Sequence, residues 1–170
     1  MGLFDRFRKS APSPIQAQAS PATLCAPMSG RVIAMDEVPD PVFSEGMLGS
    51  GCAVWPSHDV VYAPCSGTVT VAMGHAVAMT ADDGAEVLVH VGVDTVSPNG
   101  QGFTGYVKQG DHVAAGQPLI KIDRPFIAEK GLPDCVVLAV SNTADFADVR
   151  LAQAVGTTAL AGQPLLELVS

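Results

Sequence analysis

The sequence predicts an all-β domain, and three observations lead to that prediction. Hydrophobic residues make up 48% of the chain, yet aromatic residues contribute only 5%. The apolar runs are short, and 17 glycines and 13 prolines punctuate them. Two sequence patterns also occur twice each. Short runs bounded by Gly and Pro turns are typical of antiparallel sandwiches and barrels, and 170 residues suffice for one such domain with a good-sized core.

The first 22 residues are predicted to precede this domain. Residues 1–10 combine apolar and basic side chains on a short amphipathic turn, namely Leu3, Phe4 and Phe7 with Arg6, Arg8 and Lys9. Such a segment would make weak contact with an anionic membrane surface. The Pro, Ala, Ser and Gln residues that follow are typical of a flexible linker. We therefore expect a segment 1–22 and a folded domain 23–170 that starts near Thr23.

Within the domain, two patterns repeat. Ala26-Pro-Met-Ser-Gly-Arg-Val32 returns as Ala63-Pro-Cys-Ser-Gly-Thr-Val69, and the Gly-Gln-Pro-Leu of 113–122 returns within 159–168. Each copy places a Pro or Gly turn before an apolar strand. Together they resemble the duplicated hybrid motif, an antiparallel β-sandwich or barrel with short helical turns, in which each half supplies matching hairpins. Function stays open, because biotinyl and lipoyl carriers and a class of zinc peptidases use related hairpins.

A predicted hairpin brings two histidines together. Val- and Thr-rich runs flank Asp82-Asp83-Gly84, with His75 before the turn and His90 after it. A two-residue loop at Asp82-Asp83 would place the histidines directly opposite, and one at Asp83-Gly84 would make them diagonal neighbours. Either register leaves both imidazoles on one face within about 8 Å. A slip of one residue would separate them.

The strand after this turn indicates which face carries the chemistry. Val87, Val89 and Val91 alternate with Glu86, Leu88 and His90, so the valines form the natural core face. His90 then lies beside Leu88 on the other face, a setting that suits a site covered by another protein. A single histidine on a strand is more often solvated or hydrogen-bonded, so it is the pair that indicates function. His58 and His112 are interpreted as surface residues.

Charge and cysteine usage exclude several classes of protein. The net charge is −8, and after residue 10 the chain carries 6 basic against 16 acidic groups. Nucleic acid is therefore not expected as a partner, whereas basic proteins are. The chain shows neither a membrane-spanning run nor a signal peptide. Without a C-x-x-C spacing, four cysteines are expected to be buried thiols of a reducing cytoplasm: Cys25, Cys52, Cys65 and Cys135.

The chain closely resembles the glucose-type enzyme IIA (EIIA) domain of the bacterial sugar phosphotransferase system. The resemblance covers some 115 residues. It rests on these segments: Ala26-Pro-Met-Ser-Gly30, Asp36-Glu-Val-Pro-Asp40, Val42-Phe-Ser-Glu45, Gly49-Ser-Gly51, Ala63-Pro-Cys-Ser-Gly-Thr68, His75-Ala, Val87-Leu-Val-His-Val-Gly-Val-Asp-Thr-Val96, Gly100-Gln-Gly-Phe103 and Val140-Ser-Asn142. The start, Met1-Gly-Leu-Phe-Asp5, is also similar to that of stand-alone members, whose N-terminal segment contacts anionic lipid.

The resemblance implies a protein-histidine phosphotransferase component in the cytoplasm, peripheral to the membrane through residues 1–10. His90 would accept a phosphoryl group from phospho-HPr and pass it to the IIB domain of an IIB/IIC sugar permease of glucose, N-acetylglucosamine or β-glucoside type. His75 would donate a hydrogen bond to the phosphoryl oxygens. No cofactor is needed, because positioning and charge stabilisation carry most of the catalysis in phosphoryl transfer.

Docking residues follow from the same resemblance. The apolar collar around the active histidine would comprise Phe43, Met47, Leu48, Leu88 and Val96. Acidic groups that meet arginines of HPr or IIB would be Asp40 and Asp94. Two departures put partner preference in doubt. Met73 occupies the position of a Thr that usually hydrogen-bonds near the supporting histidine, and Val71 replaces a bulkier aromatic residue.

Other functions compete with this one. The main alternative is a regulatory protein that inhibits partner enzymes or permeases when unphosphorylated, through a Zn²⁺ shared by His75, His90 and a partner carboxylate. A zinc peptidase would match His90-x-x-x-Asp94 by spacing, but no H-x-H is present. A biotin or lipoyl carrier needs a lysine at a hairpin tip, and no body lysine has that sequence context: Lys108, Lys121 and Lys130.

Overall fold

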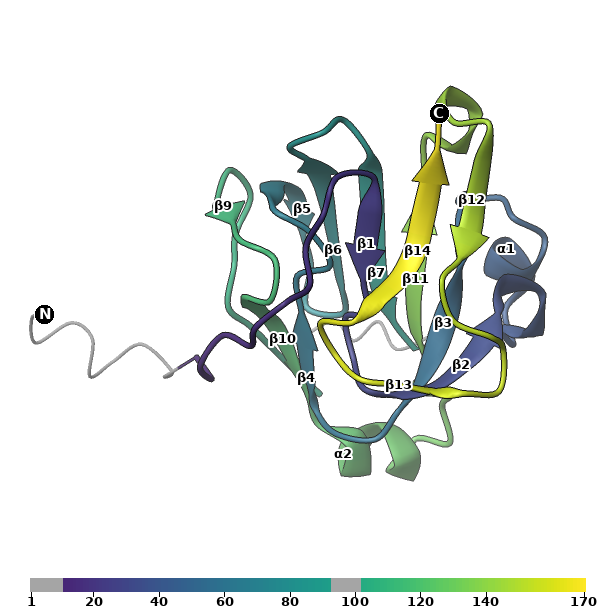
Figure 1. The fold of residues 1–170 in the computed structure, drawn as a ribbon. Helices are drawn as coiled ribbons and strands as arrows, with labels where there is room; N and C mark the ends of the chain where they lie inside the picture. The colour runs from purple at the N-terminus through teal and green to yellow at the C-terminus, as the bar shows by residue number, and fades with distance from the viewer. Residues whose placement is uncertain (1–10, 93–101) are drawn as a thin grey trace, which may run out of the picture.

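The computed structural model describes residues 11–92 and 102–170, and within these ranges the fold is almost entirely antiparallel β-structure (Figure 1). The strands are β1 (Thr23–Cys25), β2 (Gly30–Ala34), β3 (Ser50–Pro56), β4 (Val60–Tyr62), β5 (Gly67–Ala72), β6 (Ala76–Ala81), β7 (Glu86–Val91), β8 (Phe103–Gly105), β9 (His112–Val113), β10 (Pro118–Ile122), β11 (Val136–Val140), β12 (Asp148–Leu151), β13 (Thr158–Ala159) and β14 (Pro164–Val169). The helices are short: α1 (Pro41–Ser44), α2 (Arg124–Glu129) and the 3-10 helices η2 (Met35–Glu37) and η3 (Thr143–Asp145). The all-β prediction is confirmed.

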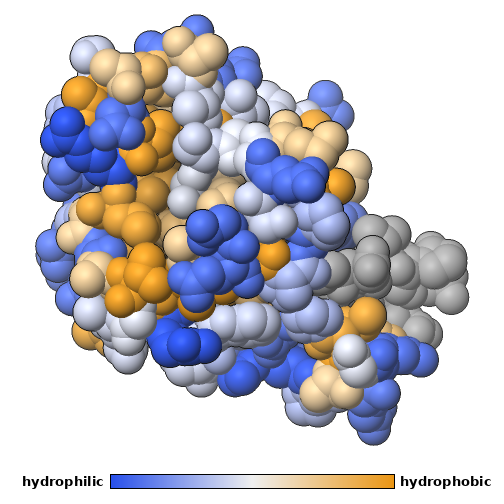
Figure 2. Space-filling model, turned by 90° about the vertical axis from the view of Figure 1, so that its right-hand side faces the viewer, coloured by the Kyte–Doolittle hydropathy of each residue, from blue (hydrophilic) through white to orange (hydrophobic). Residues whose placement is uncertain are grey.

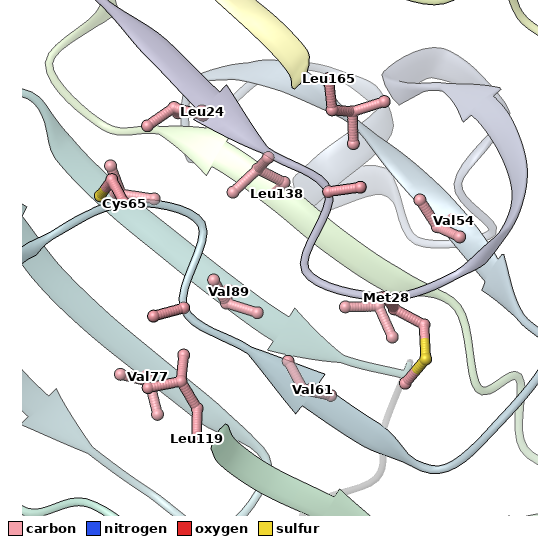
Figure 3. Close-up of a cluster of buried hydrophobic side chains, with 14 of the residues drawn as sticks. Leu24, Met28, Val54, Val61, Cys65, Val77, Val89, Leu119, Leu138 and Leu165 are labelled. Carbon is pink, nitrogen blue, oxygen red and sulfur yellow. The ribbon is translucent and has the colours of Figure 1, made fainter. Parts of the chain in front are cut away.

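In the described part of the chain, three sheets form the two layers of the domain. The large sheet has the order β13-β2-β3-β11-β7-β6-β5-β9, and two three-stranded sheets have the orders β1-β14-β12 and β4-β10-β8. The main core lies between the large sheet and the small ones. Figure 3 shows side chains from both layers pointing toward one another, among them Leu24 and Leu119 from small sheets and Val54, Val89 and Leu138 from the large sheet.

The large sheet consists of two equivalent sets of four strands, arranged in opposite order about its centre. One half contributes β2, β3 and β11 with β13, and the other contributes β5, β6 and β7 with β9, so that β11 and β7 meet at the centre. The small sheets match in the same way, with β1 and β14 in one and β4 and β10 in the other. The duplication predicted from the repeated segments is therefore a pseudo-twofold arrangement.

Equivalent hydrogen bonds explain why the two patterns repeat together. The amide of Ala26 donates to the carbonyl of Gln163 at 2.7 Å, and the amide of Ala63 donates to that of Gln117 at 2.8 Å. In the same way, a serine hydroxyl of each A-P-x-S-G copy accepts a backbone amide of its Gly-Gln-Pro turn: Ser29 from Ala161 at 2.8 Å, and Ser66 from Ala115 at 3.1 Å. Each repeated turn is thus fixed to one repeated strand start.

The second layer of packing lies on the outer face of the large sheet. Ile33, Ala53, Val137 and Ala139 form a smaller cluster there, and Phe43 of α1 covers it. The long connection between β2 and β3 (residues 35–49) therefore crosses this face and closes a second, smaller core. The site described below sits at the edge of this cluster.

Two predictions about other side chains are confirmed. The four cysteines are buried, and burial raises the pKa of Cys52 and Cys65 to about 12, so both remain thiols at neutral pH. His112 is exposed and lies 3.0 Å from Asp82, while His58 is half-buried near the surface. Within residues 11–92 and 102–170, no helix is long and apolar enough to cross a membrane.

The segment that was expected to be a flexible linker contacts the body. The amide of Ile15 donates to the carbonyl of Gly116 at 3.0 Å, and the amide of Gln18 donates to that of Gly162 at 2.8 Å. Residues 15–18 are therefore joined to the body by two backbone hydrogen bonds. Composition did not reveal this contact because its partners are backbone groups far away in the sequence.

Candidate functional site

His90 lies on the outer face of the large sheet, near the end of β7. Val87, Val89 and Val91 are buried in the main core, as predicted, so the alternate residues Leu88 and His90 point to the other face. β7 is central in the sheet, with β11 on one side and β6 on the other. This double pairing makes the backbone under His90 rigid, which suits a group that must be positioned for reaction.

His75 meets His90 from a bend rather than from a strand. The two ring centroids are 4.9 Å apart and the rings stand nearly perpendicular, with an interplanar angle of 82°. The amide of Val91 donates to the carbonyl of His75 at 2.8 Å, which ties this bend to β7. The prediction that both imidazoles lie together on one face is confirmed.

The predicted register, however, is wrong. The hairpin loop has three residues, 82–84, with Gly84 at a φ of +100°, and Ala76 pairs with His90. This is the slip of one residue that was expected to separate the histidines. They meet nonetheless, because the predicted strand breaks into β5 and β6 and residues 73–75 turn between them. Because His75 lies in a turn, its side chain does not follow the alternation of side chains between the two faces of a strand. Its ring can therefore lie on the same face as His90.

Burial gives His90 a neutral ring. The pKa of His90 is lowered to about 4, mainly by desolvation and also by the neighbouring His75, while the Gly92 backbone and Asp40 partly oppose both effects. Desolvation also lowers the pKa of His75. Both rings are therefore uncharged at neutral pH, and each offers one nitrogen lone pair and one N–H.

The two nitrogens of His90 differ in access. Nδ1 is buried and makes no hydrogen bond within the part of the chain that the structure describes, although the Gly92 backbone lies near enough to favour a protonated ring. In the tautomer that carries its proton on Nδ1, the lone pair lies on Nε2. Nε2 is then the nitrogen that can react with a group arriving from solvent.

An apolar wall surrounds the pair. Phe43 of α1 is 2% exposed and its ring centroid lies 4.8 Å from that of His90. Phe103 of β8 approaches His75 at 6.2 Å between centroids. Leu88 is half-buried two residues before His90. These contacts exclude water from one side of the imidazoles, which accounts for their desolvation.

A short helix positions the wall and one acidic group. The side chain of Asp40 accepts the amide of Val42 at 3.0 Å, and Pro41 occupies the first turn, so α1 begins at a well-formed N-cap. This cap holds Phe43 over His90 while the Asp40 carboxylate stays near enough to influence the His90 pKa. The sequence-predicted residues Asp40, Phe43 and Leu88 therefore converge on the histidines.

Beyond the wall, apolar side chains are exposed to solvent. Met47 is 69% exposed, and Val42 and Leu48 are about two-fifths exposed at 40% and 39%. Figure 2 looks onto the side of the molecule that carries α1 and shows hydrophobic patches separated by hydrophilic surface. Exposed apolar groups beside reactive imidazoles are typical of a surface that binds a protein.

Met73 and Val71, the two departures from the family pattern, lie at one end of β5. Met73 is the first residue of the 73–75 turn and its side chain is exposed, while the buried Nδ1 of His90 makes no hydrogen bond within the ranges 11–92 and 102–170. Met73 has no hydroxyl and therefore cannot itself supply the hydrogen bond of the usual Thr. Val71 is also exposed and lies near the end of β5, two residues before Met73.

Two predicted docking residues cannot be placed, and two residues at the site were not predicted. Asp94 and Val96 lie outside the described residues. Val42 and Phe103 were not predicted as site residues, although both belong to segments on which the resemblance rests. Phe103 contacts His75 from the small sheet β4-β10-β8, and no periodicity in the sequence could indicate that contact.

The donors present give a partial metal site. No group of three or more His, Cys, Asp or Glu side chains in the described ranges could hold a metal ion. His75 and His90 could supply two ligands, so any metal here would need further donors from elsewhere.

Comparison with known proteins gives a consistent result. Residues 22–146 match the family model described as phosphoenolpyruvate-dependent sugar phosphotransferase system, EIIA 1. A glucose-specific EIIA component of Oceanobacillus iheyensis is 40% identical over 130 residues, covering 75% of this chain and 79% of that protein. A solved structure, the glucose permease IIA from Mycoplasma capricolum, is 32% identical with a TM-score of 0.72, covering 85% of this chain and 93% of the other.

Larger relatives contain the matching segment as one part. The mannose-specific EIIBCA component of Corynebacterium glutamicum is 43% identical over 141 residues, which are 82% of this chain but only 21% of that protein. A glucose-specific EIIBCA component of the same species is 39% identical over 153 residues, 87% of this chain and 23% of the relative. The chain thus spans under a quarter of the length of these two relatives.

Proposed function

The chain belongs to the EIIA 1 family of the phosphoenolpyruvate-dependent sugar phosphotransferase system, and from this premise we propose that His90 is its phosphoryl acceptor. Family membership makes the chain a phosphotransferase component that takes part in phosphoryl transfer within that system. The observation that carries the assignment to His90 is the neutral, half-buried imidazole with its Nδ1 buried, beside a second imidazole at 4.9 Å between ring centroids.

The proposed step needs only groups that the site contains. The Nε2 lone pair of His90 attacks the phosphorus of phospho-HPr, the P–N bond to the HPr histidine breaks, and its electron pair returns to that histidine. His90 keeps its proton on Nδ1, so the phosphorylated ring carries no extra proton. Transfer to the IIB domain repeats the same exchange in the forward direction, with His90 as the leaving group.

His75 supports the phosphoryl group in transit. Its neutral ring carries one N–H, and the perpendicular arrangement lets that N–H point toward an oxygen on a phosphoryl group held by His90. A hydrogen bond from a desolvated donor to a developing negative charge is a strong stabilising interaction. His75 acts on the phosphoryl oxygens without becoming phosphorylated.

The partners are proposed from the surface around the pair. Exposed Val42, Met47 and Leu48 offer an apolar contact, and Asp40 with the acidic body offers charge complementarity to basic HPr and IIB surfaces. The relatives named above act in glucose and mannose systems, and we propose a sugar permease of that general kind as the acceptor. Asp94 and Val96 remain predicted docking residues.

The remaining proposals concern metal and membrane. Phosphoryl transfer here requires no cofactor, since two neutral imidazoles supply the nucleophile and the donor. A Zn²⁺ ion at His75 and His90 requires a carboxylate from a regulatory partner, because two imidazoles leave a tetrahedral ion incomplete. Residues 1–10, with their basic and apolar side chains, contact anionic lipid and place the protein at the membrane periphery.

Mass spectrometry tests the assignment. The protein is incubated with enzyme I, HPr and phosphoenolpyruvate, and we expect an acid-labile gain of one phosphate that His90→Ala lacks. His112→Ala is the matched control, because His112 is exposed and interacts with Asp82. Failure of the native chain to gain phosphate, with HPr shown to be competent on another acceptor, would favour the purely regulatory alternative. Phosphate on His90→Ala would refute the site.

A further inference from the structure

The two Gly-Gln-Pro turns repeat in the sequence, yet neither contributes to the His75–His90 site. They occupy residues 114–117 and 160–163 and are equivalent in the pseudo-twofold fold. Each contains a glycine with a left-handed backbone, Gly116 at a φ of +88° and Gly162 at +89°. The turns before β10 and β14 account for this left-handed backbone. The outer surface of both turns remains free to contact another part of the chain.

That surface holds the segment that precedes the domain. The amides of Ile15 and Gln18 donate to the carbonyls of Gly116 and Gly162. A Cβ atom at Gly116 would lie 2.3 Å from the Ile15 carbonyl oxygen, and one at Gly162 would lie 2.9 Å from the Gln16 carbonyl oxygen. Both contacts are too short for a side chain, so glycine permits the close approach of an extended segment at both turns.

The next residues continue along the same end of the molecule. The amide of Ala22 donates to the Asp83 carboxylate at 3.0 Å, so this stretch reaches the turn between β6 and β7. β7 runs from that turn to His90 at its other end, and His90 faces away from the small sheets. Figure 1 shows the segment in dark purple on the side of β1 and β14. The segment and the phosphoryl site therefore occupy opposite parts of the domain.

We propose that the two turns form a mount for residues 15–18, and that the mount fixes where the chain before residue 11 leaves the body. The ten residues beyond it carry three cations and three large apolar groups, a composition suited to an anionic lipid surface. Because the mount lies away from His90, a lipid surface and a protein docked on the His90 face can be bound at the same time. The inference rests on the proposed function in identifying the His90 face and in assigning a lipid contact to residues 1–10.

The chain supplies matched controls for the mount. Gly110 and Gly156 have φ values of +93° and +90°, and a Cβ atom at either would meet nothing within 4 Å. Alanine at all four glycines therefore introduces similar backbone strain, but only Gly116→Ala and Gly162→Ala collide with the mounted segment. We expect hydrogen exchange at the Ile15 and Gln18 amides to accelerate by about tenfold or more in these two variants, and to stay unchanged in Gly110→Ala and Gly156→Ala. Equal exchange in both pairs would overturn the mount.

A spin label tests the direction in which the chain leaves. Ala11→Cys provides an exposed thiol, whereas the four native cysteines are buried. We expect the label to broaden amide signals around residues 108–117 and to leave those of β6 and β7 near His75 and His90 sharp. In the Gly116→Ala, Gly162→Ala double variant the broadening should spread over the body. Broadening at His90 in the parent labelled chain would contradict the inference.

Simultaneous binding is the functional readout. Vesicles containing phosphatidylglycerol are added to the full chain, and phosphate uptake from phospho-HPr is followed. We expect protein attached to vesicles to take up phosphate at the rate of free protein, whereas competition between vesicle and HPr would refute the separation of the two surfaces. Loss of uptake with and without vesicles would instead count against His90 as the acceptor, so the two proposals fail in different ways.

Discussion

The two halves of the domain share a scaffold but differ in what connects their strands. In one half, residues 35–49 join β2 to β3 and carry η2 and α1, and in the other, residues 73–75 join β5 to β6. The short turn places His75 beside His90, and the long connection brings Phe43 and Asp40 from the other half over the same ring. The site thus arises where the duplicated halves differ.

The strands themselves show the same contrast. His90 pairs with Ala76 in one half, and the equivalent pair in the other half is Ala139 with Gly51. Ala139 is fully buried, and a Cβ atom at Gly51 would lie 1.9 Å from the Leu138 carbonyl oxygen. That half is packed too tightly to hold an imidazole pair, so duplication of the fold did not duplicate the chemistry.

The largest effect in this comparison is expected for His90→Ala. Without the imidazole of His90 the proposed acceptor is absent, and phosphate uptake should be lost completely because His75 is expected to act on the phosphoryl oxygens rather than to accept the group. Radiolabelled phosphate retained at alkaline pH measures the uptake. If His90→Ala still retained one radiolabelled phosphate per chain, a residue other than His90 would be the phosphoryl acceptor.

The next largest effect is expected for His75→Gln. Glutamine keeps an N–H donor but loses the imidazole geometry, so His90 should still gain phosphate while transfer to the permease slows by about 10²- to 10³-fold. A coupled assay of sugar phosphorylation measures the delivery, with His58→Gln as control. Unimpaired sugar phosphorylation by His75→Gln would show that His75, in the short β5–β6 turn, does not support phosphoryl transfer.

Protonation provides a test of the desolvated environment. The folded pKa of His90 is about 4 against an ordinary value of 6.5, so the unfolded chain binds more protons between these pH values. Its contribution to stability is therefore complete above pH 6.5 and is lost as the pH falls through 4. Relative to His90→Gln, the native chain should lose at most about 3 kcal/mol of unfolding free energy over this window, measured by urea denaturation. Parallel curves for the two proteins would mean that the ring is not desolvated.

A smaller effect is expected at the rim formed by the long connection. Met47→Ser should raise the KM for phospho-HPr severalfold, corresponding to about 1 kcal/mol, because an exposed apolar contact is lost. Its thermal midpoint should not change, since Met47 is 69% exposed. Leu160→Ser is a control from the other end of the chain, where an exposed leucine lies away from the histidines. Equal KM values for the two variants would place the docking surface elsewhere.

The smallest effect on phosphate uptake is expected for deletion of residues 1–10. Uptake from phospho-HPr should be unchanged, because the deleted residues precede the mounted segment, while co-sedimentation with anionic vesicles should weaken. Neutral vesicles serve as the control. Undiminished sedimentation with anionic vesicles would show that the body, and not the tail, carries the lipid contact.

Much of this arrangement could be predicted from the sequence, and the failures have physical causes. Repeated segments predicted the duplicated sheets, and the Val87–Val91 alternation predicted the face of His90. The register failed because Asp-Asp-Gly permits loops of two or three residues, and Gly84 with its positive φ selects three. The Phe103 contact and the mounting of residues 15–18 depend on long-range packing, for which the local sequence carries no signal.

The most direct test of the account is to determine which nitrogen of His90 carries the phosphoryl group. Nitrogen-15 NMR of the phosphorylated, histidine-labelled protein distinguishes Nε2 from Nδ1. Because Nδ1 is buried, we expect a phosphoryl group on Nε2 with the proton retained on Nδ1. A phosphoryl group on Nδ1, or on a ring other than that of His90, would contradict it.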